Sequence, residues 1–132
     1  MDLAERIRAA RKVMLIGNGG SFANAMHIAN DLLSCGIPAY TMDPATFSAF
    51  ANDNGYYQAF RLWLKVVGEP GDLLIALSGS GKSPNILLAC DEARLIGMDV
   101  YTLFGAELGQ DMQTAETYQL VIGHELLKAL RK

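Results

Sequence analysis

Two loops rich in glycine and serine, each directly after a short apolar run, most strongly constrain how this chain can fold. The first has the sequence GNGGS at residues 17–21, and the second has the sequence SGSGKS at residues 78–83. A helical pattern follows each loop. A buried strand, a glycine turn and a helix N-terminus together form an anion site, because the exposed N–H groups and the helix dipole both favour negative charge. We therefore expect a ligand with a phosphate at one end and hydroxyl groups at the other.

Apolar runs alternate with helical patterns along the whole chain. They predict strands over residues 13–17, 38–42, 72–77, 99–104 and 117–122. They predict helices over residues 2–11, 22–34, 56–67, 83–97 and 124–131, and a further helix that begins at the Asp43-Pro44 pair. Ser21 is expected to cap the second helix. This βα alternation predicts one domain over residues 1–132, a three-layer α/β/α sandwich with a five-stranded parallel sheet in flavodoxin-like order. The ligand is expected at the carboxyl ends of the strands.

The composition limits which binding partners and which cellular location we expect for this protein. The net charge of −3 comes with no basic run, which argues against nucleic-acid binding. Charged residues make up only 19% of the chain, and aromatic residues gather over residues 47–63, so we expect a homodimer or homotetramer that partly buries this segment. No apolar stretch approaches the length of a membrane span. Cys35 and Cys90 are isolated and are interpreted as reduced thiols of a cytoplasmic protein.

The second loop is the stronger candidate for a phosphate site. Ser78, Ser80 and Ser83 place three hydroxyl groups within six residues, while Gly79 and Gly81 allow the backbone to approach an anion closely. An ordinary turn with a helix cap is the simpler alternative. A nucleotide-binding P-loop is disfavoured, because that motif needs a glycine at position 76, where this chain has an alanine.

The first loop fits a dinucleotide-binding turn poorly, because Phe22 stands where that fingerprint needs its third glycine. We expect instead a polar turn that holds sugar hydroxyls, with Asn18 and Ser21 as donors and acceptors. Residues 52–55 form a polar turn between two predicted helices, and the simplest interpretation of this turn is a helix stop.

Histidine and aspartate side chains supply the candidate chemistry. His27 and Asp31 lie four residues apart and share one helix face. An imidazole and a carboxylate at this spacing can bind zinc or act as an acid/base pair, and an ordinary surface pair is the alternative. His124, the only other histidine, begins the last predicted helix. It is interpreted as a third member of the site, with a cap or an interface residue as the alternative.

Taken together, these segments resemble the SIS (sugar isomerase) domain family, in the branch that contains phosphoheptose isomerase and the DnaA-initiator-associating protein. The similarity rests on GNGGS at residues 17–21, AMH at 25–27, Asp43, NDNGY at 52–56, GD at 71–72 and SGSGKS at 78–83. The resemblance implies a phosphate site, which is formed by Ser78, Gly79, Ser80 and Ser83. It also implies sugar contacts, which come from Asn18, Gly19, Gly20, Asn52 and Asp53.

The branch binds zinc through a histidine, a glutamate four residues later, a glutamine and a second histidine. His27 matches the first ligand, Asp31 replaces the glutamate, and His124 matches the last; the glutamine has no clear equivalent. The resemblance implies an aldose–ketose isomerase for a phosphorylated sugar, most specifically sedoheptulose 7-phosphate, with proton transfer through an enediol. Asp31 is then the candidate base and His124 the candidate acid. A non-catalytic sugar-phosphate-binding or protein-interaction module is the alternative, favoured by the short C-terminal segment.

Overall fold

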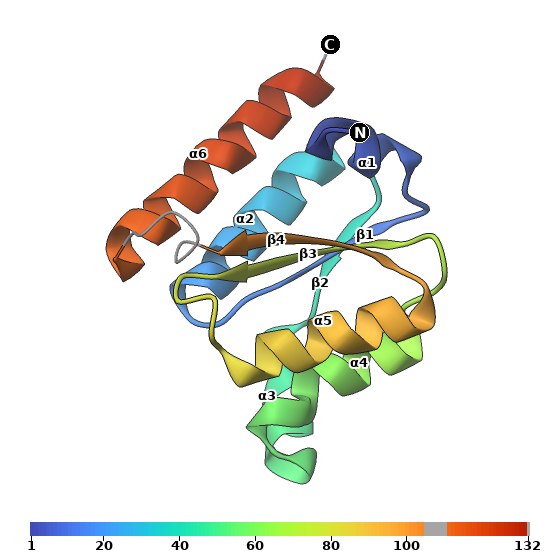
Figure 1. Ribbon diagram of the computed structural model, residues 1–132, viewed down its shortest axis with the longest axis vertical. Helices are drawn as coiled ribbons and strands as arrows, with labels where there is room; N and C mark the ends of the chain where they lie inside the picture. Colours follow the sequence, from blue (N-terminus) through green and yellow to red (C-terminus); the bar gives the residue numbers. More distant parts are fainter. Residues whose placement is uncertain (105–110, 132) are drawn as a thin grey trace.

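The computed structural model describes residues 1–104 and 111–131, and it has the expected α/β/α layers (Figure 1). In chain order the elements are α1 (Leu3–Ala9), β1 (Val13–Ile16), α2 (Gly20–Ser34), β2 (Ala39–Thr41), α3 (Pro44–Asn54), the 3-10 helix η1 (Tyr56–Gln58), α4 (Ala59–Val67), β3 (Leu73–Ser78), α5 (Pro84–Ile96), β4 (Asp99–Phe104) and α6 (Met112–Leu130).

Four parallel strands form the sheet of the described residues, in the order β2-β1-β3-β4. This order agrees with the flavodoxin-like expectation for the first four strands. Every residue of β1 and β3 is buried, which explains their unbroken apolar runs. Because β1 and β3 are neighbours in register from Val13↔Leu73 to Ile16↔Ala76, the loops that follow them emerge side by side.

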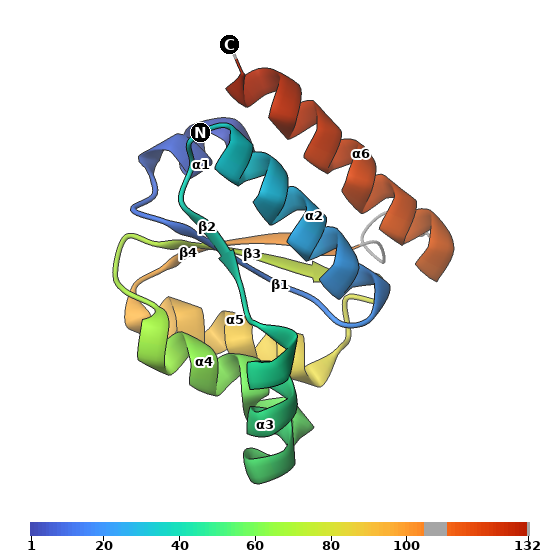
Figure 2. The ribbon, with the colours of Figure 1, turned by 180° about the vertical axis from the view of Figure 1, so that it is seen from behind.

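The two faces of the sheet carry separate apolar cores. Val13 and Leu15 of β1 point into the core beneath α1, α2 and α6, whereas Met14 and Ile16 point into the core beneath α4 and α5. This alternation follows from the two-residue period of a strand. Figures 1 and 2 show the same division, with α3 extending below the second layer. No helix of the described ranges combines the length and apolar character that a membrane span needs.

The prediction of a fifth strand over residues 117–122 is wrong, because this segment lies inside α6. Ala115, Gln119, Gly123 and Leu126 are the buried residues of α6, and their spacing of three to four residues places them on one helix face. Asp111 caps the helix by accepting a hydrogen bond from the Thr114 N–H. The helix predicted over residues 124–131 is the second half of this longer helix.

Two expected helix starts also differ from the structure. Ser21 does not cap α2, which begins at Gly20, two residues before the expected start, with Gly19 as its N-cap; Ser21 is buried in the first turn. The helix expected from residue 56 begins as η1 and becomes α-helical at Ala59. The start at Asp43 is confirmed, because its carboxylate accepts a hydrogen bond from the Ala45 N–H at 3.0 Å.

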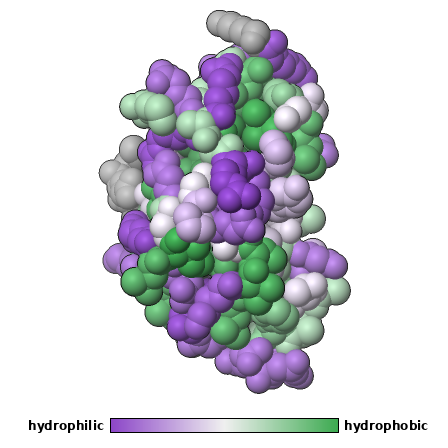
Figure 3. All heavy atoms as spheres, turned by 90° about the vertical axis from the view of Figure 1, so that its right-hand side faces the viewer, coloured by the Kyte–Doolittle hydropathy of each residue, from purple (hydrophilic) through white to green (hydrophobic). Residues whose placement is uncertain are grey.

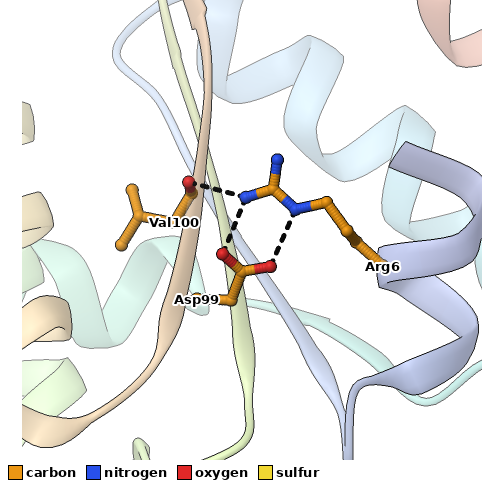
Figure 4. A network of polar contacts seen from close by, with 3 residues as sticks. All are labelled: Arg6, Asp99 and Val100. Atoms are coloured by element: carbon orange, nitrogen blue, oxygen red, sulfur yellow. Dashed lines mark hydrogen bonds and ion pairs between the residues drawn. The ribbon is translucent and has the colours of Figure 1, made fainter. Parts of the chain in front are cut away.

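A bidentate pair of hydrogen bonds from Arg6 links α1 to the edge strand β4 (Figure 4). The Arg6 guanidinium donates to both carboxylate oxygens of Asp99, at 2.8 and 2.7 Å, and to the Val100 carbonyl at 3.0 Å. These hydrogen bonds from Arg6 lower the pKa of Asp99. They join segments 93 residues apart at the amino end of the sheet. Figure 3 faces this end and shows hydrophilic residues across its middle with hydrophobic patches below.

Candidate functional site

The carboxyl end of the sheet gathers three helix N-termini. The loop after β1 leads into α2, and the loop after β3 leads into α5. Figure 1 shows α2, α5 and α6 all beginning at its left side, where β1 and β3 end. The positive ends of helix dipoles and the free backbone N–H groups of first turns therefore lie around the two loops, which is the environment that an anionic ligand requires.

The three serine hydroxyls of the second loop converge. Ser78 Oγ lies 3.2 Å from Ser83 Oγ and 3.5 Å from Ser80 Oγ. The Gly81 N–H donates to Ser78 Oγ at 3.0 Å, and the Lys82 N–H donates to Ser80 Oγ at 3.1 Å. Gly81 has a φ of +69°, a conformation that glycine adopts without strain. The loop is thus an ordered cluster of hydroxyls at the start of α5, able to turn O–H donors toward a phosphate.

Helix α6 packs against both glycine loops, although no helix was predicted over residues 112–123. A Cβ on Gly79 would lie 2.6 Å from Met112 Sδ, and a Cβ on Gly20 would overlap the Glu116 carboxylate. These glycines therefore give α6 room to approach the loops. The carboxylate of Glu116 consequently stands beside the first turn of α2.

Glu116 was missed because it directly precedes residues 117–122, which were predicted to form a strand, so no helix was expected to carry it. The signal that could have found it is helical: an aspartate that can cap a helix at position 111, followed by small or buried residues at 115, 119 and 123. On a helix of this register, Glu116 lies at the end nearest the first loop.

Ser21 lies in a buried polar network between α2 and α6 rather than open in the site. Gln119 Nε2 donates to Ser21 Oγ at 3.1 Å and to the Leu103 carbonyl at 3.4 Å. Asn24 Nδ2 donates to Gln119 Oε1 and to the Glu116 carbonyl, each at 2.9 Å. This network holds α6 against the start of α2, so Ser21 stabilises the packing of these two helices.

Asn18, expected at the sugar, makes a reciprocal pair of amide hydrogen bonds with Asn85 of α5. Asn52 and Asp53 lie exposed near the end of α3, where Asn52 Nδ2 donates to Asp53 Oδ1 at 3.2 Å. Their turn reaches the first loop through Tyr56, whose hydroxyl donates to Asn18 Oδ1 at 2.9 Å.

His27, Asp31 and His124 lie close together along the seam between α2 and α6. His27 Nε2 is 3.5 Å from Asp31 Oδ2, and the rings of His27 and His124 are 5.8 Å apart in an edge-to-face arrangement. Asp31 Oδ2 is buried and has no hydrogen-bond partner among the described residues. Its nearest polar neighbour is therefore the His27 imidazole, at the length of an ion pair rather than of a good hydrogen bond.

The histidine–aspartate cluster is set back from the loops along α2. With a rise of 1.5 Å per residue, His27 stands about 10 Å along the axis from Gly20. A ligand that bridges the serine loop and this cluster must be extended.

A doubly wound parallel sheet with glycine and serine loops at its carboxyl end defines a class of α/β domains that bind phosphorylated ligands. The chain belongs to the SIS domain family, whose pattern matches residues 2–105.

Similar proteins agree with this assignment. The phosphoheptose isomerase of Sodalis glossinidius is 40% identical over 121 residues, which cover 86% of this chain and 62% of that protein. The phosphoheptose isomerase of Burkholderia pseudomallei strain K96243 is 38% identical over 133 residues, 88% of this chain and 68% of that protein. The chain thus spans less than two thirds of the length of the Sodalis relative.

Solved structures show the same fold. A phosphoheptose isomerase structure from Francisella tularensis has a TM-score of 0.84 and 27% identity, covering 96% of this chain and 81% of that chain. The phosphoheptose isomerase structure from Neisseria gonorrhoeae has a TM-score of 0.85 and 23% identity, and the match covers 97% of this chain and 80% of that chain. The three-layer fold expected from the sequence is therefore confirmed, with four strands in the described residues rather than five.

Proposed function

We propose that this chain carries an aldose–ketose isomerase site whose substrate is sedoheptulose 7-phosphate. The observation that carries the proposal is the pairing of two unlike groups in one domain. Three serine hydroxyls converge at the start of α5. His27 and Asp31 lie about 10 and about 16 Å along α2 from Gly20, and the ring of His124, from α6, packs against that of His27. The relatives named phosphoheptose isomerase support the same substrate class.

In this proposal the phosphate end supplies binding energy and the helix seam supplies chemistry. Ser78, Ser80 and Ser83 hold the phosphate at the N-terminus of α5. Holding the non-reacting end fixes the distance and orientation of C1 and C2. It thereby converts binding energy into a lower barrier at the reacting end.

The reaction needs one base and one acid. Asp31 removes a proton from C1 of the ketose while His124 donates a proton to the C2 carbonyl oxygen, which gives the enediol. Return of a proton to C2 and loss of the O1 proton complete the aldose. The protons that leave equal those that return, so the step needs no oxidant or reductant.

Zinc at His27, Asp31 and His124 stands as part of the proposal. Two imidazoles and a carboxylate are donors that zinc accepts. Within the described residues, however, no three such side chains are gathered closely enough to hold one ion. A bound zinc would polarise the sugar carbonyl. No step above depends on it.

The proposal includes a cytoplasmic homodimer or homotetramer. Tyr56 and Tyr57 are 46% and 56% exposed, and they belong to the aromatic segment over residues 47–63. Aromatic side chains exposed in one subunit are typical of subunit interfaces. Light scattering at micromolar concentration should report a mass of at least two chains, and a monomer would contradict this part.

The proposed activity is tested by NMR of sedoheptulose 7-phosphate incubated with the protein, with and without added zinc. We expect new anomeric signals of the aldose with the unaltered protein and none with Asp31→Asn, which keeps the shape but removes the base. The melting temperature of Asp31→Asn should stay close to that of the unaltered protein, because asparagine has the same shape and its side-chain oxygen can still contact His27. Asp91→Asn, an exposed aspartate on α5, is the matched control and should retain turnover.

Binding of the sugar phosphate without any turnover by the unaltered protein would contradict the isomerase proposal. It would favour the non-catalytic binding module instead. Equal turnover by Asp31→Asn would leave the activity standing and contradict the assignment of the base.

A further inference from the structure

Side chains from three separate segments meet at the first loop. Asn18 follows β1, Asn85 lies in the first turn of α5, and Tyr56 begins η1. Asn18 Nδ2 donates to Asn85 Oδ1 at 2.9 Å, and Asn85 Nδ2 donates to Asn18 Oδ1 at 2.8 Å. The Tyr56 hydroxyl donates to the same Asn18 Oδ1 at 2.9 Å. The network therefore joins the sugar loop to the phosphate helix and to the turn at residues 52–55.

The hydrogen-bonding capacity of Asn18 is used unevenly. Its carbonyl oxygen has two lone pairs, and the two donors from Asn85 and Tyr56 occupy both. Its amide nitrogen has two hydrogens, and one of them is given to Asn85. The second hydrogen is not used by this network. Asn18 is only half-buried, so a bound ligand can reach it.

Asn85 cannot serve the ligand in the same way. It is 1% exposed, and its oxygen and nitrogen are both engaged with Asn18. Buried amide groups must keep their hydrogen bonds, because an unpaired one carries the full cost of desolvation. Asn85 therefore acts as a fixed template that sets the orientation of the Asn18 carboxamide. It lies two positions after Ser83, so the same contact ties the sugar loop to the phosphate loop.

We infer that Tyr56 and Asn85 are positioning residues that fix the Asn18 carboxamide, so that it donates an N–H to an acceptor oxygen of the bound sugar. The inference rests on the proposed function and names how the site selects its ligand at this point. With both lone pairs of Asn18 Oδ1 filled, the side chain serves a sugar hydroxyl or carbonyl only as a donor.

The ring of Tyr56 is itself held in place. It meets the Phe47 ring edge-to-face, with centroids 5.5 Å apart, and the Tyr57 ring at 6.1 Å. Such contacts fix the ring without using the hydroxyl. Replacement of tyrosine by phenylalanine at position 56 therefore removes the one hydrogen bond and leaves the packing in place.

The test compares Tyr56→Phe with Tyr57→Phe by calorimetry, using sedoheptulose 7-phosphate and inorganic phosphate as probes. Tyr57→Phe is the matched control, because it removes a hydroxyl from the neighbouring ring. We expect Tyr56→Phe to weaken sugar-phosphate binding about fivefold, the worth of one hydrogen bond between neutral groups. Binding of inorganic phosphate should be unchanged, because the Tyr56 hydroxyl donates its hydrogen bond to Asn18 and not to a serine of the second loop. A purely structural defect would lower both affinities and the melting temperature.

A second comparison tests whether Tyr56 acts through Asn18. In an Asn18→Ala background, Tyr56→Phe should cause no further loss of affinity for the sugar phosphate. If the two residues acted independently, the losses from the two substitutions would add. If the unaltered protein binds the sugar phosphate and Tyr56→Phe binds it equally well, the inference is wrong and the proposed function stands. If the unaltered protein binds inorganic phosphate but not the sugar phosphate, both are wrong.

Discussion

Replacing Gly123 with alanine should loosen the helix seam on which the proposed chemistry depends. Gly123 is buried in the interior of α6, where it faces Ile28 of α2. A Cβ at this position would lie 2.8 Å from Ile28 Cγ1 and 3.2 Å from Ile28 Cδ1. Ile28 is 1% exposed, and its β-branched side chain has few alternative rotamers in a helix. The clash must therefore be relieved by moving α6 away from α2.

The net effect of Gly123→Ala on the free energy of unfolding is the difference between a gain in helix propensity and a cost of overpacking. Alanine in a helix interior gains up to about 1 kcal/mol over glycine. Overpacking of a well-filled core costs about 1–3 kcal/mol. We expect a net loss of about 1 kcal/mol, which lowers the melting temperature of a chain of this size by roughly 3–5 °C. Since His124 is the next residue, its distance from His27 should change and sugar-phosphate turnover should fall.

Thermal unfolding followed by circular dichroism measures this effect, and Ile28→Ala supplies the control background. Truncating Ile28 opens the space that the added methyl needs, so Gly123→Ala should be neutral or stabilising in that background. A rise in melting temperature when Gly123→Ala is introduced into the unaltered protein would refute the close-approach argument, because only the helix-propensity term would then be at work.

Two further predictions concern titratable groups. Burial raises the pKa of the Cys90 thiol to about 11, so iodoacetamide should label Cys35 and spare Cys90 near neutral pH; equal labelling of both in the folded protein would contradict this. The hydrogen bonds from Arg6 lower the pKa of Asp99 in the folded protein. This contribution to the free energy of unfolding is fully present above the unfolded pKa of about 3.9. It is lost as the pH falls through the lower pKa that Asp99 has in the folded protein. Urea unfolding should show a smaller loss of stability on acidification in Asp99→Asn than in the unaltered protein, and equal losses would argue against it.

The four strands of the sheet and both glycine loops could be predicted because their signals are local. Buried parallel strands are continuous apolar runs, and the glycines at 19 and 81 mark backbone with positive φ. The Asp43-Pro44 start was equally local, since the aspartate caps the helix with its own carboxylate. Each of these features is determined by residues within a few positions of one another, so the sequence pattern alone reveals it.

The seam between α2 and α6 could not be predicted in the same way. Residues 117–122 combine apolar and β-favouring side chains, so their local preference suggested a strand. Packing against α2 decides otherwise, through Gln119 in its buried network with Ser21 and through the close approach of Gly123 to Ile28. The carboxylate of Glu116 beside Gly20 depends on this packing. It becomes visible only once both helices are placed.

The central claim is that the serine loop at the start of α5 binds the phosphate of a sugar phosphate. Calorimetric titration of sedoheptulose 7-phosphate into the unaltered protein, the Ser80→Ala/Ser83→Ala double variant and the Ser48→Ala control tests it most directly. Hydrogen bonds to charged groups contribute about 1.5–3 kcal/mol each, so the double variant should bind at least about a hundredfold more weakly. Ser48 is an exposed residue of α3, and its replacement should leave the affinity unchanged. Equal affinity in the double variant and the unaltered protein would contradict the claim.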